Sequence, residues 1–378
     1  MPELPLTEVQ SRFSRIQTAL DRTELGGLLA YADCWRSSNV GFFTGFRPLD
    51  GVGDYPMAAV LLPRNGDPEL FVAEGALGWA TDATTFGVRN MTELPDAVRT
   101  WAAQNSGPLG LAGADFVPAS LRDRIDAALD GTPLQVTDVL AKVKAVKSEW
   151  EIGILREAAR FNDIAMEVIR DALASGVPQT ERDLARLADS AMIDAGADGV
   201  AFLSMVQSGP RSSWNLDLPS DRVIQSGDLV LTDIGARYKG YSADGGRGFG
   251  FGAITQRQRD VVEASVAAVE AGMNVVRPGL SAADLNAVIQ SVLIERGMAE
   301  FSGEARGHGT GHGTGMDPEE EEPWISPHNP IELEQNMVFT LKATITVPDV
   351  GGLRTERIVR VTADGGEALD HFPMKNFW

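Results

Sequence analysis

Two aspartates in the middle of the chain have the types and the spacing of a functional pair. Asp233 lies within the apolar run 229–236, and Asp244 follows eleven residues later, with glycines between them. This pattern predicts two antiparallel strands joined by a short turn, an arrangement that can aim both carboxylates at one point. A solvated hairpin is the alternative, but an unpartnered carboxylate inside an apolar run would be costly. The sequence therefore favours a functional pair.

Further candidates follow towards the C-terminus. His308 and His312 are two of only four histidines, and both lie in the glycine-rich run 307–315. The glycines allow close backbone approach beside a site. Arg354 and Glu356 form an Arg-x-Glu motif, which on an edge strand would otherwise be a surface ion pair of little energetic value. Together with the two aspartates, this set could bind a metal or perform acid–base chemistry.

The order of these motifs resembles the creatinase, aminopeptidase P, prolidase and methionine aminopeptidase family. The resemblance covers nearly the whole chain, and it includes the segments 39–46 and 147–151. It implies an α+β fold in which a smaller mixed α/β domain, residues 1–141, precedes a pita-bread catalytic domain, residues 142–378. The family's pita-bread domain usually binds two divalent metals through Asp, Asp, His, Glu and Glu. By resemblance, four of these ligands match Asp233, Asp244, His312 and Glu356, and Arg354 belongs to the family's terminal Arg-x-Glu. Arg354 and His308 are candidates for substrate binding, and for His308 a structural hydrogen bond is the equal alternative.

Three positions depart from the family pattern. Lys342 falls where the family has a metal-binding glutamate, and Glu319 falls where it has a histidine that assists proton transfer. Leu216 stands where a third catalytic histidine is usual. An ammonium about 4 Å from a divalent ion would be repelled by roughly 8 kcal/mol at an effective dielectric of 20. The sequence therefore predicts that no metal is bound, with Lys342 pairing with the carboxylates. A single Mn, Fe or Zn ion held by Asp233, Asp244, Glu356 and His312 is the alternative, and a Lys342 that points to solvent also stays open.

These departures favour a creatinase-like hydrolase of a C–N bond, amide or amidine-like, in a small cationic or zwitterionic nitrogenous compound. His312 and Glu319 are the candidates for general acid–base work. Lys342 could stabilise a developing oxyanion, while Asp233, Asp244 and Glu356 would orient the substrate or water. Two rivals remain: a mononuclear metal-dependent Xaa-Pro-type peptidase or small-molecule lyase, and a non-catalytic binding protein on a peptidase scaffold. Resemblance of fold alone does not choose between them.

The composition of the chain argues against several classes of binding partner. The 378 residues carry a formal net charge of −20, which argues against nucleic acid or an anionic membrane as partner. The single cysteine, Cys34, can form no internal disulfide, and the N-terminus lacks the features of a signal peptide. We expect a soluble, cytoplasmic enzyme. By resemblance we also expect a homodimer, with Trp35 and Arg36 of one chain as candidates for the rim of the other's substrate site and ordinary loop residues as the equal alternative.

Periodicity and capping signals predict the elements that must position these residues. A helix is expected over 6–21, and a long amphipathic helix follows Ser148, which with Glu151 forms a capping box. Strands are expected over the segments 202–206, 229–235, 242–251, 336–347 and 354–362.

Overall fold

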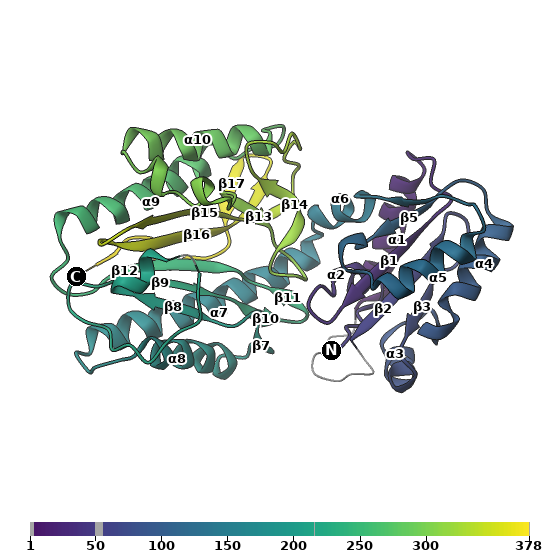
Figure 1. Ribbon diagram of the computed structural model, residues 1–378, viewed down its shortest axis with the longest axis horizontal. Coiled ribbons are helices and arrows are strands. Elements are labelled where there is room, and N and C mark those ends of the chain that lie inside the picture. The colour runs from purple at the N-terminus through teal and green to yellow at the C-terminus, as the bar shows by residue number, and fades with distance from the viewer. Residues whose placement is uncertain (1–3, 50–55, 215, 378) are drawn as a thin grey trace. The chain divides into compact units, whose positions relative to one another are not determined.

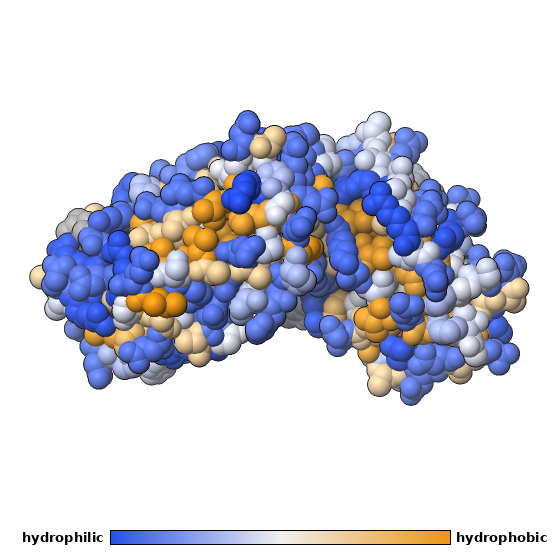
Figure 2. All heavy atoms as spheres, turned by 90° about the horizontal axis from the view of Figure 1, so that it is seen from above, coloured by the Kyte–Doolittle hydropathy of each residue, from blue (hydrophilic) through white to orange (hydrophobic). Residues whose placement is uncertain are grey.

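The computed structural model describes residues 4–49, 56–214 and 216–377. The chain divides into two compact units, Met1–Lys144 and Ala145–Trp378 (Figure 1). Each unit has its own sheets and its own apolar core. Hydrophilic side chains cover much of the face shown in Figure 2, with apolar patches between them. Among the described residues, no helix is both long and apolar enough to cross a membrane.

The N-terminal unit is built on a six-stranded mixed sheet in the order β4-β3-β2-β1-β5-β6. Strand β2 pairs antiparallel with β1 and β3, whereas the other neighbours pair in parallel. The strands are β1 (Gly27–Asp33), β2 (Met57–Pro63), β3 (Glu69–Val72), β4 (Gly87–Asn90), β5 (Leu109–Ala112) and β6 (Leu134–Val136). The helices are α1 (Leu6–Leu20), α2 (Ser38–Thr44), α3 (Leu77–Ala83), α4 (Leu94–Gln104), α5 (Ala119–Leu129) and α6 (Val139–Ala145).

The segment 39–46 lies in helix α2 and in the turn that follows it at Gly45. Lys144 donates hydrogen bonds to Ser38 Oγ at 2.6 Å and to Asn39 Oδ1 at 2.7 Å. The Asn39 amide in turn donates to the carbonyl oxygen of Tyr31 at 3.2 Å. All these groups are buried, where an unsatisfied polar atom would be costly. The polar residues of this segment therefore have a structural role in the N-terminal unit.

The C-terminal unit contains three sheets, in the orders β11-β10-β7, β18-β12-β9-β8 and β14-β13-β15-β16-β17. The first sheet comprises β7 (Gly199–Val200), β10 (Ala236–Tyr238) and β11 (Tyr241–Ser242). The second comprises β8 (Met205–Ser208), β9 (Leu229–Ile234), β12 (Gly245–Gly250) and β18 (Asn376–Phe377). The third comprises β13 (Gly311–Gly313), β14 (Glu320–Ile325), β15 (Val338–Val347), β16 (Gly351–Thr362) and β17 (Gly365–Ala368).

Two pairs of helices cover these sheets. Helices α7 (Glu149–Ala174) and α8 (Glu181–Asp194) share an apolar core with β8, β9 and β12. Helices α9 (Gln256–Val275) and α10 (Ala282–Glu295) share another with β15 and β16. Figure 1 shows the two pairs on opposite sides of the strands. The strands thus share apolar cores with both pairs of helices, and the α+β pita-bread architecture is confirmed.

Several elements agree with the sequence, and others do not. Helix α7 begins after Ser148, whose side chain and that of Glu151 form the predicted capping box. The strand expected over 202–206 instead begins at Met205, and Leu203 before it is exposed. The strand expected over 242–251 is divided into β11 and β12, because the chain leaves the strand conformation just before and at Asp244.

Candidate active site

The two aspartates lie on neighbouring parts of one sheet. Asp233 is in β9, paired in register with Gly246 of β12, and Asp244 immediately precedes β12. Both side chains are buried. The Thr340 hydroxyl of β15 donates to the carbonyl oxygen of Asp244 at 3.1 Å, which ties this turn to the facing sheet. The sequence prediction that the two carboxylates are aimed at one point agrees with this arrangement.

Glu356 reaches the aspartates from the facing sheet. Carboxylate oxygens of Asp233, Asp244 and Glu356 all lie within 4.8 Å of one another. A Cβ added to Gly246 would lie 2.7 Å from Glu356 Oε2, so any larger residue there would displace the glutamate. The glycine in β12 is therefore required for the close approach of the two sheets at this point. The sequence analysis did not single out Gly246. Its position two residues after Asp244, a predicted site residue, could have pointed to it.

His312 completes the cluster from β13. Its Nδ1 lies 3.1 Å from the carbonyl oxygen of Gly313, which accepts the Nδ1 proton. Its Nε2 lies 3.4 Å from Asp244 Oδ2 and 3.5 Å from Glu319 Oε1. Since Nδ1 carries the proton, Nε2 presents its lone pair to the carboxylates. The ring is fully buried, whereas 57% of the Glu319 side chain is exposed.

Two basic residues share the site with the carboxylates, and they differ in their contacts. Arg354 Nε lies 3.3 Å from Asp233 Oδ2, and Arg354 Nη2 lies 2.7 Å from Glu356 Oε1. Lys342 is opposite Glu356 in the β15–β16 register and is buried, so it does not point to solvent. Its ammonium makes no hydrogen bond and no ion pair within 4.0 Å to any described residue. The pairing that the sequence assigned to Lys342 is thus made by Arg354, which reaches two carboxylates with its longer, forked side chain.

Burial dominates the electrostatics of the cluster. It raises the pKa of Asp233 to about 6, although Arg354 opposes this rise, and with the help of Glu356 it raises the pKa of Asp244 well above the usual range. Burial also lowers the pKa of His312 well below its usual value, and nearby Lys342 lowers it further. Burial and the neighbouring Arg354 lower the pKa of Lys342. For Arg354, burial is outweighed by the surrounding carboxylates, which raise its pKa.

The remaining predicted site residues lie outside this cluster. His308 is largely exposed, and the partial burial of its ring, together with Lys342 and Arg354, lowers its pKa. Leu216 is half-buried in the loop that follows β8. Trp35 and Arg36 belong to the N-terminal unit, where 68% of Trp35 is exposed and the Arg36 guanidinium lies 3.9 Å above the Phe116 ring. Their role at a substrate site stays a prediction.

A supporting ion pair was also missed by the sequence analysis. Lys147 Nζ lies 2.8 Å from Glu320 Oε2, and both side chains are buried. The other oxygen of Glu320 accepts from the Met316 amide at 3.0 Å. This pair fixes the turn that carries Glu319 beside His312. The sequence could not distinguish Glu320 from its acidic neighbours, because the partner lies 173 residues away.

The cluster has the donor set of a cation site. Asp233 Oδ1, Asp244 Oδ1, Glu356 Oε2 and His312 Nε2 are buried and have no hydrogen-bond partner among the described residues. Buried polar atoms in proteins are nearly always satisfied, and the three carboxylates, whose oxygens lie within 4.8 Å of one another, fit one divalent ion, with His312 beside them. The sequence resemblance assigned the place of the family's fifth ligand to Lys342, and an ammonium cannot coordinate a cation. The residues therefore fit one ion and do not fit the usual pair.

Comparison with known proteins identifies the family. The description "Metallopeptidase family M24" matches residues 153–363. The chain is 30% identical over 340 residues to the Xaa-Pro dipeptidase of Pyrococcus horikoshii, covering 88% of this chain and 90% of that one. Dipeptidase PepE from Mycobacterium ulcerans superposes with a TM-score of 0.85 at 27% identity, covering 99% of each chain. X-Pro aminopeptidase from Thermotoga maritima superposes with a TM-score of 0.82 at 26% identity, covering 96% and 98%.

The sequence motifs, the two-unit α+β fold and these similarities agree with one another. The chain belongs to metallopeptidase family M24, the creatinase, aminopeptidase P and prolidase family, and it is a hydrolase that acts on C–N bonds.

Proposed function

We propose that this hydrolase cleaves an amide or amidine-like C–N bond in a small nitrogenous compound, without a dinuclear metal centre. The observation that carries the proposal is Lys342, a buried ammonium opposite Glu356 at the position of a metal-binding carboxylate. Arg354 adds a permanent positive charge to the same cluster. Two further divalent ions would be repelled by both side chains. The protein's own cations thus supply charge that metals supply in other members.

His312 is the proposed general base. The carbonyl of Gly313 holds the Nδ1 proton, so Nε2 is free to take a proton from a water molecule. A lowered pKa keeps the ring neutral, which preserves this lone pair at neutral pH. The water oxygen then attacks the substrate's carbon, and the proton passes by way of Glu319, 3.5 Å from Nε2, to the leaving nitrogen. The exposed position of Glu319 suits contact with a departing amine.

Lys342 is the proposed oxyanion donor. Attack by water places negative charge on the substrate's carbonyl oxygen, and a buried ammonium that forms no ion pair within 4.0 Å to a described residue can stabilise that charge. Asp233 and Glu356 are partly neutralised by Arg354, which leaves Asp244 and Glu319 to attract a positive group. A cationic or zwitterionic substrate fits this distribution of charge. His308, at the exposed edge, is a proposed substrate contact.

A mononuclear metal enzyme, either an Xaa-Pro-type peptidase or a lyase, is the second candidate. The unsatisfied carboxylate oxygens of Asp233, Asp244 and Glu356 favour it, because one ion between them would satisfy all three. When bound, such an ion would act as a Lewis acid on the substrate's carbonyl. Arg354 would then hold two of the ligands in place.

Elemental analysis of protein purified without added metal, followed by assays on a panel of small amides, amidines and Xaa-Pro dipeptides, tests both candidates. We expect fewer than one divalent ion per chain and cleavage of a non-peptide compound that chelators do not abolish. Stoichiometric metal with chelator-sensitive cleavage of Xaa-Pro dipeptides would replace the first candidate with the second. Two ions per chain would contradict both.

We also propose a homodimer in which Trp35 and Arg36 of one chain border the substrate site of the other. The exposed Trp35 lies beside Arg36, whose guanidinium is positioned over Phe116. Tryptophan and arginine are residue types that are enriched among the energetically important residues of protein interfaces. One chain has a mass of 40.5 kDa, and light scattering at micromolar concentration should give twice that mass. A strictly monomeric mass would contradict this arrangement.

A further inference from the structure

The chain passes between two sheets of the C-terminal unit beside each aspartate of the cluster. Strand β9 of the second sheet ends at Ile234, one residue after Asp233, and β10 of the first sheet begins at Ala236. On the return, the chain leaves β11 of the first sheet and enters β12 of the second at Gly245, one residue after Asp244. Both carboxylates therefore lie next to a point where the regular hydrogen bonding of a sheet changes.

A single side chain of α7 bridges the first of these crossings. The Asn162 amide nitrogen Nδ2 donates to the carbonyl oxygen of Ile234 at 3.0 Å. Its Oδ1 accepts from the backbone amide of Ala236 at 2.7 Å. The two bonds lie on either side of Gly235, where a neighbouring strand would otherwise supply a donor and an acceptor. Asn162 thus takes the place of a strand at the crossing that follows Asp233.

Asn162 also lies against the chain beside the other aspartate. A Cβ added to Gly245 would lie 3.3 Å from Asn162 Nδ2, so the amide packs directly on this glycine. Gly245 is paired with Ile234 in the register of β9 and β12. One amide group therefore contacts the main chain next to Asp233 and the main chain next to Asp244.

The surroundings of Asn162 are otherwise apolar. Its side chain is 3% exposed and lies on the buried face of α7, where Ala158, Ala165 and Met166 pack into the core. A buried amide without partners would be costly, and alanine has the higher helix propensity. Both ends of the Asn162 amide are instead satisfied by main-chain groups beside the site. The use of asparagine here follows from those two bonds and not from the packing of the helix.

The other neighbour of Asp233 is also held from the side of α7. The Thr232 hydroxyl donates to the carbonyl oxygen of Arg247 at 2.8 Å and lies 3.5 Å from Met166 Sδ. Because side chains alternate along a strand, Asp233 points away from this face. Helix α7 therefore fixes the strand on both sides of the aspartate, from the face opposite to its carboxylate.

We propose that Asn162 is a positioning residue, which sets the direction and separation of the Asp233 and Asp244 carboxylates from the far side of their sheet. It rests on the proposed function only in that these two aspartates belong to the site. The metal-free hydrolase and the mononuclear metal enzyme both use them, so the role of Asn162 is the same in either.

Crystal structures and calorimetric titration with Mn²⁺ test the proposal, because one ion reports on the mutual position of the carboxylates. In Asn162→Ala the oxygens of Asp233 and Asp244 should move apart. Mn²⁺ should bind about 10-fold more weakly than to the wild type, the lower end of the range for a residue behind the ligands.

Asn162→Asp provides a milder variant of the same size. Its ionised carboxylate keeps an acceptor for the Ala236 amide but has no proton to donate to the carbonyl oxygen of Ile234, so Mn²⁺ affinity should again fall. Burial raises the pKa of such a carboxyl, and the protonated form can donate. The difference from the wild type, measured at each pH, should therefore shrink as the pH is lowered.

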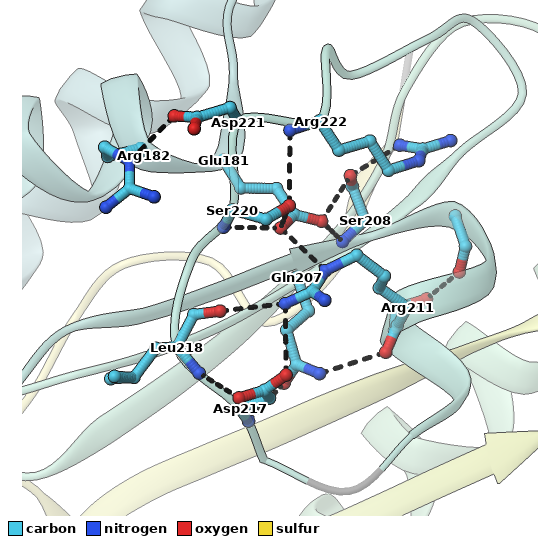
Figure 3. A network of polar contacts seen from close by, with 12 residues as sticks. Glu181, Arg182, Gln207, Ser208, Arg211, Asp217, Leu218, Ser220, Asp221 and Arg222 are labelled. Atoms are coloured by element: carbon cyan, nitrogen blue, oxygen red, sulfur yellow. Dashed lines mark hydrogen bonds and ion pairs between the residues drawn. The ribbon is translucent and has the colours of Figure 1, made fainter.

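Glu181→Gln is the matched control, because Glu181 is also a buried polar residue that holds main-chain groups of the same unit. At the start of α8, it accepts from the amide and hydroxyl of Ser208 at 2.8 and 2.9 Å and from those of Ser220 at 3.0 and 2.7 Å (Figure 3). Arg211 Nε donates to it at 3.0 Å. Its substitution should lower the melting temperature and leave Mn²⁺ affinity unchanged.

Unmoved carboxylates and an unchanged Mn²⁺ affinity in Asn162→Ala, with only a lower melting temperature, would show that Asn162 supports the fold alone and would overturn the proposal. An equal loss of affinity in Glu181→Gln would overturn it too, since the effect would then come from general destabilisation. If the wild type binds no Mn²⁺, the carboxylate positions in the crystal structures decide. None of these measurements involves turnover, so they stand apart from the test of the proposed function.

Discussion

Two buried acidic centres of the C-terminal unit are opposite in their hydrogen bonding. Glu181 accepts five hydrogen bonds from three residues, and both its oxygens are satisfied. In the cluster of Asp233, Asp244 and Glu356, each carboxylate has a buried oxygen with no hydrogen-bond partner among the described residues. Both centres are buried to a similar degree. Burial alone therefore does not distinguish a structural carboxylate from a functional one, but satisfaction does.

The difference follows from what surrounds each centre. Glu181 lies against backbone amides and serine hydroxyls, which donate hydrogen bonds to both of its oxygens. The cluster lies between two sheets whose own amides are used in strand pairing, so few backbone donors remain for it. Unsatisfied buried carboxylates are tolerated where a substrate, water or ion completes them. We therefore expect the cluster to contribute mainly to catalysis and Glu181 mainly to the free energy of unfolding.

The largest effect is expected in catalysis. His312→Ala, Glu319→Gln and Lys342→Met should each lower kcat by about 10²–10⁴-fold, the range for a lost acid, base or oxyanion donor. Combined substitutions should lose less than the product of the single effects, because the three groups act as one unit. Steady-state kinetics on the substrate found by screening, together with melting temperatures, gives the measurement. Near wild-type kcat in all three variants would place the chemistry elsewhere.

For stability, substitution of Glu181 should have a larger effect than substitution in the cluster of Asp233, Asp244 and Glu356. Glu181→Gln should lower the free energy of unfolding by about 2–4 kcal/mol, because it leaves buried donors unpaired. Glu356→Gln should cost less, about 1–2 kcal/mol, because it weakens one contact, that with Arg354, which still pairs with Asp233. Urea unfolding of both variants measures the difference. Equal losses would remove the distinction between the two centres.

Metal affinity should depend on the charge at position 342. Lys342→Glu removes a positive charge and restores an anionic ligand, so divalent ions should bind on the order of 10–100-fold more tightly than to the wild type. Calorimetric titration with Mn²⁺ gives the affinities. Lys342→Met, which removes the charge without adding a ligand, separates the two contributions. An unchanged affinity in Lys342→Glu would falsify the view that Lys342 excludes a second ion.

The smallest effect is the pH dependence of Asp233. Its folded-state pKa of about 6 lies above the unfolded value near 4, so the carboxyl favours folding below pH 4 and loses this contribution as pH rises through 6. Asp233→Asn should therefore gain stability relative to the wild type between pH 4 and 7, by on the order of 1–2 kcal/mol. Melting temperatures across this range provide the test. A relative gain that instead grows as pH falls would contradict the raised pKa.

The sequence alone determined the family, the fold class and most of the long elements. Helix α7 could be predicted with its capping box, because Ser148 and Glu151 act within one helical turn. Asp233, Asp244, His312 and Glu356 could be selected because motif and spacing are local properties of the chain. Strands β13 and β14 were not predicted, since glycine and glutamate have low strand propensity and tertiary pairing overrides it here.

Only the tertiary structure decided how the charges are distributed. That Arg354 and not Lys342 pairs with the carboxylates depends on the reach of two side chains on adjacent strands, which no spacing encodes. The anchoring of a loop by Glu181 joins α8 to residues 27 and 39 positions away. Such contacts are set by the packing of separate elements, where ångström differences decide whether a buried charge is satisfied. The sequence specified which groups are present, and the packing specified which of them are left available for chemistry.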